Sequence, residues 1–149
     1  MIPSTIHPHV RSGAERRLFD VIRDAPGTDD WVCLHSLGLA RHARKRRGEI
    51  DFLLLTRKGI FVLEVKGGRV SRKGGIWQFT DRYGDVHEKH ESPFDQASSG
   101  MFALEEDFRR EYRQDDRRSR LLFGFGAMFP DIVFDVTGTE ADQRQVYDA

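Results

Sequence analysis

Residues 49–67 read Glu-Ile-Asp-Phe-Leu-Leu-Leu-Thr-Arg-Lys-Gly-Ile-Phe-Val-Leu-Glu-Val-Lys-Gly. Two apolar runs in this stretch flank a polar turn that ends at Gly59. Each run is shorter than a typical helix, and the second is rich in β-branched and aromatic residues. The stretch therefore predicts a β-hairpin with Gly59 at positive φ. Because successive residues are apolar, we expect helices to cover both faces of these strands.

The flanking sequence predicts two helices and further strands. Ser12 and Glu15 have the spacing of a capping box, which starts a first helix that ends before Pro26-Gly27. Ser92-Pro93 starts the longest helix, because serine caps a helix well and proline suits its first position. Short apolar runs predict strands at residues 31–34, 76–80 and 121–125, and the polar residues 35–48 are expected to form a loop. This order indicates a mixed α/β fold with a small sheet.

Composition limits the class of protein. The chain has 149 residues, and its 24 Lys and Arg balance 24 Asp and Glu. This length fits one domain, and the apolar content of 38% argues against disorder. No apolar stretch approaches the roughly 20 residues of a membrane helix, and the start of the chain lacks the pattern of a secretion signal. Cys33 is the single cysteine, which excludes an internal disulfide and favours a reducing compartment, most simply the cytoplasm.

Charge is distributed unevenly along the chain. Residues 41–47 hold five cationic side chains in seven positions, whereas residues 131–149 hold five acids and one arginine. The basic run is compatible with a face that binds a polyanion, although a charge run taken alone more often marks an ordinary solvated surface. We expect an N-terminal extension at residues 1–11, one domain at residues 12–130, and an acidic tail or the start of a linker at residues 131–149.

Three charged residues interrupt the apolar hairpin: Asp51, Glu64 and Lys66. A turn over residues 56–59 places Asp51 opposite Glu64. A turn of residues 58–59 alone places Asp51 opposite Lys66, and a three-residue turn puts Asp51 on the other face of the sheet. Two of the three turns therefore bring two carboxylates and one ammonium group together.

Such a group of charges has two interpretations. Two carboxylates on an apolar sheet repel each other, and a divalent cation such as Mg²⁺ or Mn²⁺ would resolve the repulsion. A lysine beside that cation could orient or activate a water molecule that attacks a phosphate. A purely structural role would instead give a strand-end ion pair between Glu64 and Lys66, with Asp51 solvated where its strand begins.

The motifs in their order along the chain resemble the nuclease-related domain (NERD) family of the PD-(D/E)xK nuclease superfamily. The resemblance covers roughly residues 12–125. It is carried by Glu15, Gly48-Glu49-Ile50-Asp51, Glu64-Val65-Lys66-Gly67, Gly74-Gly75-Ile76-Trp77 and Ser92-Pro93-Phe94-Asp95-Gln96-Ala97. Ile50 stands where the superfamily signature has proline. The resemblance implies a restriction-endonuclease-like core, in which a small mixed β-sheet is flanked by helices.

The resemblance also implies an activity, namely metal-dependent hydrolysis of phosphodiester bonds in DNA, with RNA as an alternative substrate. Asp51, Glu64 and the Val65 carbonyl would bind Mg²⁺ or Mn²⁺, and Lys66 would position or help deprotonate the attacking water. Glu15 would approach the metal directly or through water, and Gln96 would contact the site from the second helix. Alternatively, Glu15 only completes a capping box and Gln96 is only a polar residue of a first helical turn.

Basic side chains would hold the DNA backbone without reading its sequence. The candidates are Arg41, Arg44, Lys45, Arg46, Arg47, Arg69, Arg72 and Lys73. Two other functions stay open. The chain could be a catalytically silent nucleic-acid-binding or docking module of a larger DNA-processing or defence assembly, or a structural or regulatory domain beside a helicase or kinase.

Overall fold

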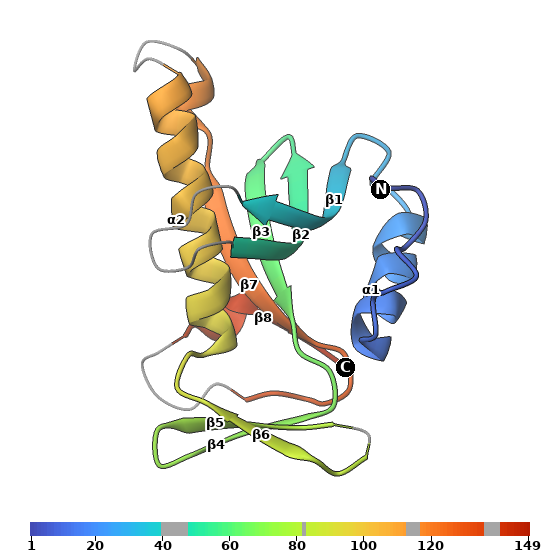
Figure 1. Cartoon of the computed structure of the whole chain (residues 1–149). Coiled ribbons are helices and arrows are strands. Elements are labelled where there is room, and N and C mark those ends of the chain that lie inside the picture. Colours follow the sequence, from blue (N-terminus) through green and yellow to red (C-terminus); the bar gives the residue numbers. More distant parts are fainter. Residues whose placement is uncertain (40–47, 82, 113–116, 136–140) are drawn as a thin grey trace.

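A five-stranded mixed sheet forms the centre of the protein, with strand order β1-β2-β3-β7-β8 (Figure 1). The computed structural model describes the chain except for residues 40–47, 82, 113–116 and 136–140. Neighbouring strands β1, β2 and β3 are antiparallel, whereas β3, β7 and β8 are parallel. The strands are β1 (Val32–Leu39), β2 (Gly48–Thr56), β3 (Gly59–Val65), β7 (Phe123–Phe129) and β8 (Val146–Asp148).

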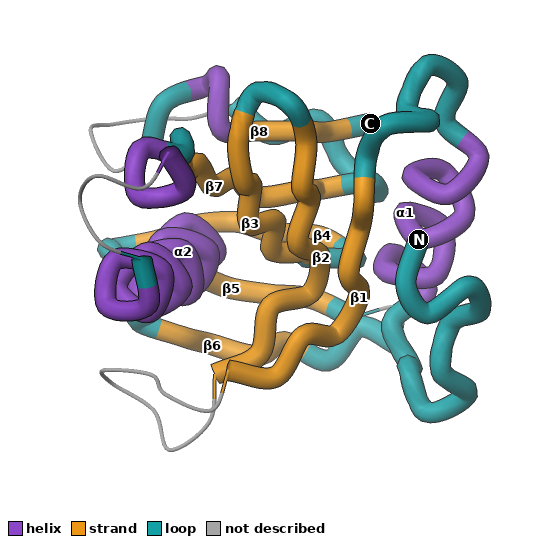
Figure 2. The backbone as a smooth tube through the Cα atoms, turned by 90° about the horizontal axis from the view of Figure 1, so that it is seen from above, coloured by secondary structure: helices purple, strands orange, loops and turns teal. Residues whose placement is uncertain are grey.

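Two helices cover opposite faces of this sheet (Figure 2). Helix α1 spans Gly13–Asp24 and helix α2 spans Pro93–Glu111. A second, antiparallel sheet lies at one end of the molecule and consists of β4 (Arg69–Lys73), β5 (Ile76–Thr80) and β6 (Val86–Lys89). Short 3-10 helices occupy Arg117–Arg120 and Gln143–Gln145. Within the described ranges, no helix has the length and apolar character that crossing a membrane requires.

The hairpin explains why both faces are covered. Phe52 and Leu54 of β2 pack with Phe19 of α1, whereas Leu53 packs with Ala97 and other residues of α2. Successive apolar residues of β2 therefore pack into two separate hydrophobic clusters, one against α1 and the other against α2. This arrangement confirms the predicted mixed α/β, nuclease-like core with a small sheet between helices.

The turn of the hairpin is the four-residue alternative. Leu55 pairs with Ile60 and Thr56 pairs with Gly59. Gly59 has φ +153°, and a Cβ there would collide with the carbonyl oxygen of Leu122. Glycine is required at this position because a neighbouring segment occupies the space of a side chain.

Some predicted boundaries are wrong. Strand β1 continues to Leu39, so residues 35–39 are not the expected loop, while residues 40–47 lie outside the described part of the chain. Strands β4 and β6 are mostly exposed, so their sequences lack the apolar residues by which strands are predicted. The last predicted strand lies at Phe123–Phe129, because Leu122 is 59% exposed and precedes the paired residues.

The chain end, expected to be an acidic tail or linker, packs on the domain where it is described. Strand β8 pairs with β7. The ring of Phe134 stacks on Phe129 at 4.4 Å and on Trp77 at 5.9 Å between ring centroids. At the other end of the chain, Ile2 exchanges backbone hydrogen bonds with β1. Packing therefore extends beyond residues 12–130, and those domain boundaries stay a prediction.

Candidate active site

Asp51 lies where strand β2 stops alternating regularly. Phe52 packs with the α1 cluster, yet Ile50, two residues earlier, packs with the α2 cluster. A regular strand would place these two side chains on one face. The pairing of β2 with β3 ends at Phe52 and Leu63, and Asp51 follows directly beyond that pair. Opposite this point in β1, Ser36 has a left-handed backbone with φ +53°.

The irregularity turns the carboxylate of Asp51 toward the end of β3. Its Oδ2 accepts a hydrogen bond of 2.8 Å from the backbone N–H of Val65, the residue between Glu64 and Lys66. Burial raises the pKa of Asp51, and the Val65 N–H and the Lys66 charge oppose that rise. A purely structural role would leave Asp51 solvated at the start of its strand. The buried, hydrogen-bonded carboxylate does not fit that expectation.

Glu64 and Lys66 form an ion pair through Glu64 Oε1 and Lys66 Nζ. Their side chains are only 13% and 18% exposed. The Lys66 ammonium also lies 5.9 Å from the ring centroid of Phe79 on β5. This ion pair is what a purely structural role predicts, so the pair alone gives no support to a catalytic role.

Glu15 reaches the site from the first turn of α1. Ser12 Oγ accepts the N–H of Glu15 at 3.2 Å, but the Glu15 carboxylate does not return to the cap. Instead, its Oε1 lies 2.8 Å from Nε2 of His35 on β1. Burial raises the pKa of Glu15, and the negative charge of Asp51 raises it further. The interpretation of Glu15 as only a capping-box residue therefore does not hold.

His35 is the main residue that the sequence prediction missed. Its side chain is 1% exposed and lies between the rings of Phe19 and Phe52, at 5.2 and 4.9 Å between centroids. Exposed Glu49 was also missed as a site residue, although its charge raises the pKa of both Glu15 and Asp51.

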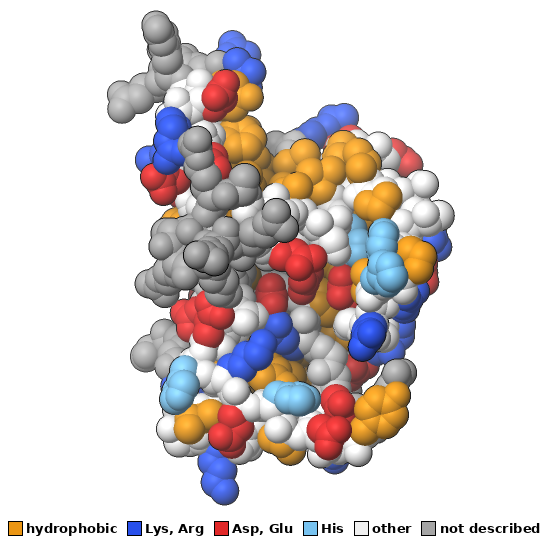
Figure 3. All heavy atoms as spheres, viewed as in Figure 1, with side chains coloured by type: hydrophobic (Ala, Val, Ile, Leu, Met, Phe, Trp, Pro, Cys, Tyr) orange, Lys and Arg blue, Asp and Glu red, His pale blue; other side chains and the backbone are white. Residues whose placement is uncertain are grey.

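Acidic side chains gather at the centre of the face of the molecule seen in Figure 3, between α2 and α1, with basic side chains beside them.

Gln96 lies on the first turn of α2, but its described hydrogen bond goes to Glu91 rather than to Asp51. Its Nε2 donates to Glu91 Oε2 at 3.1 Å. Its Oε1 is buried and has no hydrogen-bond partner within the described ranges. Ser92 and Asp95 complete the capping box of α2 without Gln96. A buried acceptor without a partner is costly, which suits a position where a ligand or water supplies the missing donor.

The predicted DNA-contacting residues fall into two groups. Arg41, Arg44, Lys45, Arg46 and Arg47 lie outside the described part of the chain. Arg69, Arg72 and Lys73 lie exposed on β4 of the small sheet. Contact of either group with a nucleic acid stays a prediction.

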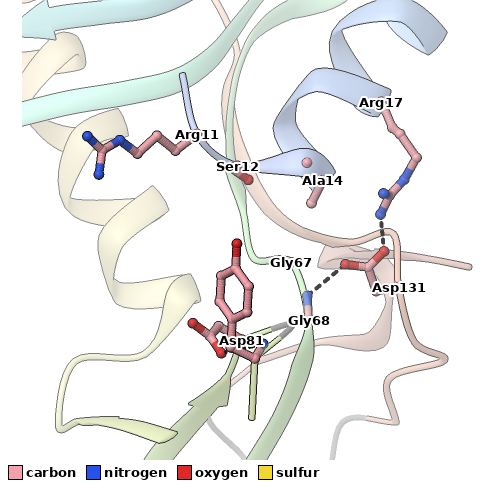
Figure 4. A pocket seen from close by; sticks show the side chains of 10 residues that line it. Arg11, Ser12, Ala14, Arg17, Gly67, Gly68, Asp81 and Asp131 are labelled. Carbon is pink, nitrogen blue, oxygen red and sulfur yellow. Dashed lines mark hydrogen bonds and ion pairs between the residues drawn. The ribbon is translucent and has the colours of Figure 1, made fainter. Parts of the chain in front are cut away.

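A pocket of about 580 Å³ lies beside the candidate site, between the start of α1, the Gly67-Gly68 connection and the turn near Tyr83 (Figure 4). On one side, Asp131 forms an ion pair with Arg17 and accepts the Gly68 N–H at 2.7 Å. Arg11 extends away from this ion pair, and no hydrogen bond or ion pair of Arg11 occurs within the described ranges.

The pocket wall also fixes the position of α1 against β3. A Cβ on Gly67 would lie 2.6 Å from the Cβ of Ala14, so helix and connection are in direct contact at this point. Ala14 precedes Glu15 and Gly67 follows Lys66. The glycine contact therefore sets the relative positions of two candidate catalytic residues.

The acidic residues suit a hard divalent cation. No group of three or more His, Cys, Asp and Glu side chains in the described part of the chain is placed to hold a metal. Mg²⁺ commonly uses one or two carboxylates and completes its shell with water and substrate phosphate. The raised pKa values of Asp51 and Glu15 indicate that a positive group would be favourable beside these two carboxylates. Separately, the buried Oε1 of Gln96 would accept a donor that no described residue supplies. By contrast, burial raises the pKa of the Cys33 thiol to about 11, which argues against a reactive thiolate.

The raised pKa of Asp51 predicts a cost in stability without metal. The folded state binds the Asp51 proton more tightly than the unfolded state, so stability falls as pH rises from the ordinary value of 3.8 through the raised pKa. We expect Asp51→Asn, which keeps an acceptor for the Val65 N–H, to raise the melting temperature by a few degrees at pH 7 in EDTA. The gain should vanish below pH 4. Asp29→Asn at an exposed turn is the control and should change little, and an Asp51→Asn protein less stable than wild type at pH 7 would contradict the assignment.

Comparison with known proteins gives a family for the chain. The profile of a family described as the nuclease-related domain matches residues 11–124. No curated protein and no solved structure gives a significant match. The matched residues include α1, β1 to β6 and α2, and hence every candidate site residue from Glu15 to Gln96. The chain therefore belongs to the nuclease-related domain family, within the PD-(D/E)xK-like nucleases.

Proposed function

We propose that this protein is a Mg²⁺- or Mn²⁺-dependent nuclease that hydrolyses phosphodiester bonds of DNA. The observation that carries the proposal is the hydrogen bond from the Val65 N–H to Asp51, which joins β2 to the Glu-Val-Lys segment of β3. Membership of the nuclease-related domain family supports a nuclease-related function. A free, buried Cys33 is consistent with our proposal that the protein acts in the reducing cytoplasm.

Asp51 and Glu64 are the proposed metal ligands, together with the carbonyl of Val65. The described hydrogen bond of Asp51 uses Oδ2. Its other oxygen, Oδ1, takes part in no described hydrogen bond and could therefore bind the cation. When bound, the cation would stabilise the negative charge that develops on the attacked phosphate. The cation would also offset the free-energy cost of burying the negative charge of Asp51. In the metal-free chain, that burial raises the pKa of the Asp51 carboxyl.

Lys66 is the proposed partner of the attacking water. Its ammonium group is mostly buried and close enough to lower the pKa of Asp51. A positive charge in such a place can hold a water or a phosphate oxygen and can offset charge that forms during the reaction. The described ion pair with Glu64 would have to loosen in the substrate complex, as it would if Glu64 bound a cation.

The pocket beside α1 is the proposed path for the nucleic-acid strand next to the scissile phosphate. Two residues that line the pocket are sequence neighbours of candidate catalytic residues: Ala14 precedes Glu15, and Gly67 follows Lys66. Arg11 has no described ionic partner and can neutralise a phosphate there. The basic residues of β4 and of segment 41–47 are further candidates for contacts with the phosphate backbone.

Cleavage of DNA tests the proposed function. We expect plasmid or linear DNA to be cut in Mg²⁺ or Mn²⁺ and not in EDTA. Asp51→Asn and Lys66→Met should each reduce the initial rate by at least about 100-fold, because they remove a metal ligand and the partner of the water. Lys89→Met is a matched control, since its ammonium lies 5.9 Å from the same Phe79 ring, and it should keep near wild-type activity. Equal cleavage by wild type and both site variants would indicate a contaminant and contradict the proposal.

Binding tests the role of the pocket. In an Asp51→Asn background, Arg11→Ala should weaken binding of a short single-stranded DNA several-fold. The slope of log affinity against log salt should become less steep by about the contribution of one phosphate contact. Fluorescence anisotropy at several salt concentrations would measure both. The control Arg23→Ala removes an arginine that is paired with Asp20 and Asp24 at the far end of α1. An Arg11 variant with unchanged affinity and slope would place the strand elsewhere.

A catalytically silent nucleic-acid-binding or docking module that serves a helicase, a kinase or another domain is the second candidate. The ion pair between Glu64 and Lys66 favours it, because each of these side chains already has a partner without metal. This function predicts salt-dependent DNA binding that survives EDTA and Asp51→Asn, with no cleavage of DNA or RNA.

A further inference from the structure

We infer that His35 is a positioning residue, whose imidazole holds the carboxylate of Glu15 in the orientation that the metal site needs. The inference rests on the proposed metal-dependent function. It adds to that function a residue on β1 that lies outside the Asp51, Glu64 and Lys66 set.

The surroundings of His35 leave its imidazole one described polar partner. Its side chain is 1% exposed and lies between the rings of Phe19 and Phe52. A buried imidazole without a hydrogen bond would cost free energy in such an apolar place. Its Nε2 lies 2.8 Å from Glu15 Oε1, so the position of His35 is tied to that of Glu15.

Glu15 is held at both its backbone and its side chain. The Ser12 cap fixes its N–H, and the close contact of Gly67 with Ala14 fixes the helix against the end of β3. His35 then holds Oε1, while no described hydrogen bond of Glu15 uses Oε2. One carboxylate oxygen is therefore anchored, and the other stays available for a cation or its water.

A second observation links this pair to Asp51 through electrostatics. The charge of Asp51 raises the pKa of Glu15, and the interaction with His35 lowers it. If the pair served only stability, apolar residues of similar volume could replace it at little cost. Groups that orient metal-facing carboxylates and histidines typically matter 10- to 100-fold for metal affinity or activity.

Three variants separate positioning from packing. His35→Leu keeps apolar bulk and removes the hydrogen bond, His35→Gln keeps an N–H donor, and Glu15→Gln removes the charge that His35 holds. Titration calorimetry with Mn²⁺ alone gives metal affinity without substrate. Initial rates give kcat and KM for DNA, and thermal unfolding reports whether each variant is folded.

We expect His35→Leu to weaken Mn²⁺ binding about 10- to 100-fold and to lower kcat by a similar factor, with KM for DNA nearly unchanged. His35→Gln should recover most of both losses. The double variant of His35→Leu and Glu15→Gln should be no worse than Glu15→Gln alone, because the two residues act through one carboxylate.

Two results would overturn the inference. His35→Leu could bind Mn²⁺ and cleave DNA as wild type does, while Asp51→Asn is inactive, in which case the proposed function stands and the positioning role falls. Alternatively, His35→Gln and His35→Leu could lose affinity equally and in proportion to lost stability, which would make His35 a packing residue. If Mn²⁺ binding follows the expected pattern but wild type cleaves no nucleic acid, the nuclease function fails and the positioning role remains.

Discussion

The hydrogen bond between the Val65 N–H and the Asp51 carboxylate is the interaction on which the site depends. It forms where the pairing of β2 with β3 has ended, so the backbone donor of Val65 is satisfied by a side chain and not by the neighbouring strand. A buried carboxylate costs free energy unless donors compensate it. One backbone N–H and the nearby Lys66 charge supply part of that compensation, and the pKa of Asp51 nevertheless stays raised.

The surrounding fold serves to bring scattered polar groups to this point. Helix α1 carries Glu15, strand β1 carries His35, and the direct contact at Gly67 holds the helix against the end of β3. Two carboxylates with raised pKa values are an unfavourable arrangement for stability alone. Clusters of carboxylates with raised pKa values mark functional sites in many proteins. A bound ligand there offsets the electrostatic cost that the folded chain leaves uncompensated.

Much of the fold could be predicted from the sequence, because the hairpin and both helices carry local signals that agree with their packing. The consecutive apolar residues around Leu53 predict a doubly covered sheet, and Ser92 with Pro93 predicts the start of α2. The exposed strand β4 could not be predicted, since its pairing with β5 depends on a neighbour and not on its own apolar residues. The packing of Phe134 on Phe129 was missed for a similar reason, because one aromatic ring in an acidic segment has no periodicity.

The candidate site was only partly predictable. The hairpin sequence left three possible turns, and hence three positions for Asp51 relative to Glu64 and Lys66. The break in β2 that turns the Asp51 carboxylate toward Val65 has no local sequence signal. His35 was missed because a histidine followed by Ser36 reads as the start of a polar loop, although its ring is buried by Phe52 of the adjacent strand.

Anomalous diffraction from crystals grown or soaked in Mn²⁺ tests the central claim most directly, because it locates the ion without relying on activity. The account predicts a strong peak within coordination distance of carboxylate oxygens of both Asp51 and Glu64. Crystals that contain Mn²⁺ at other places, with ordered water and no anomalous signal between these two carboxylates, would contradict it.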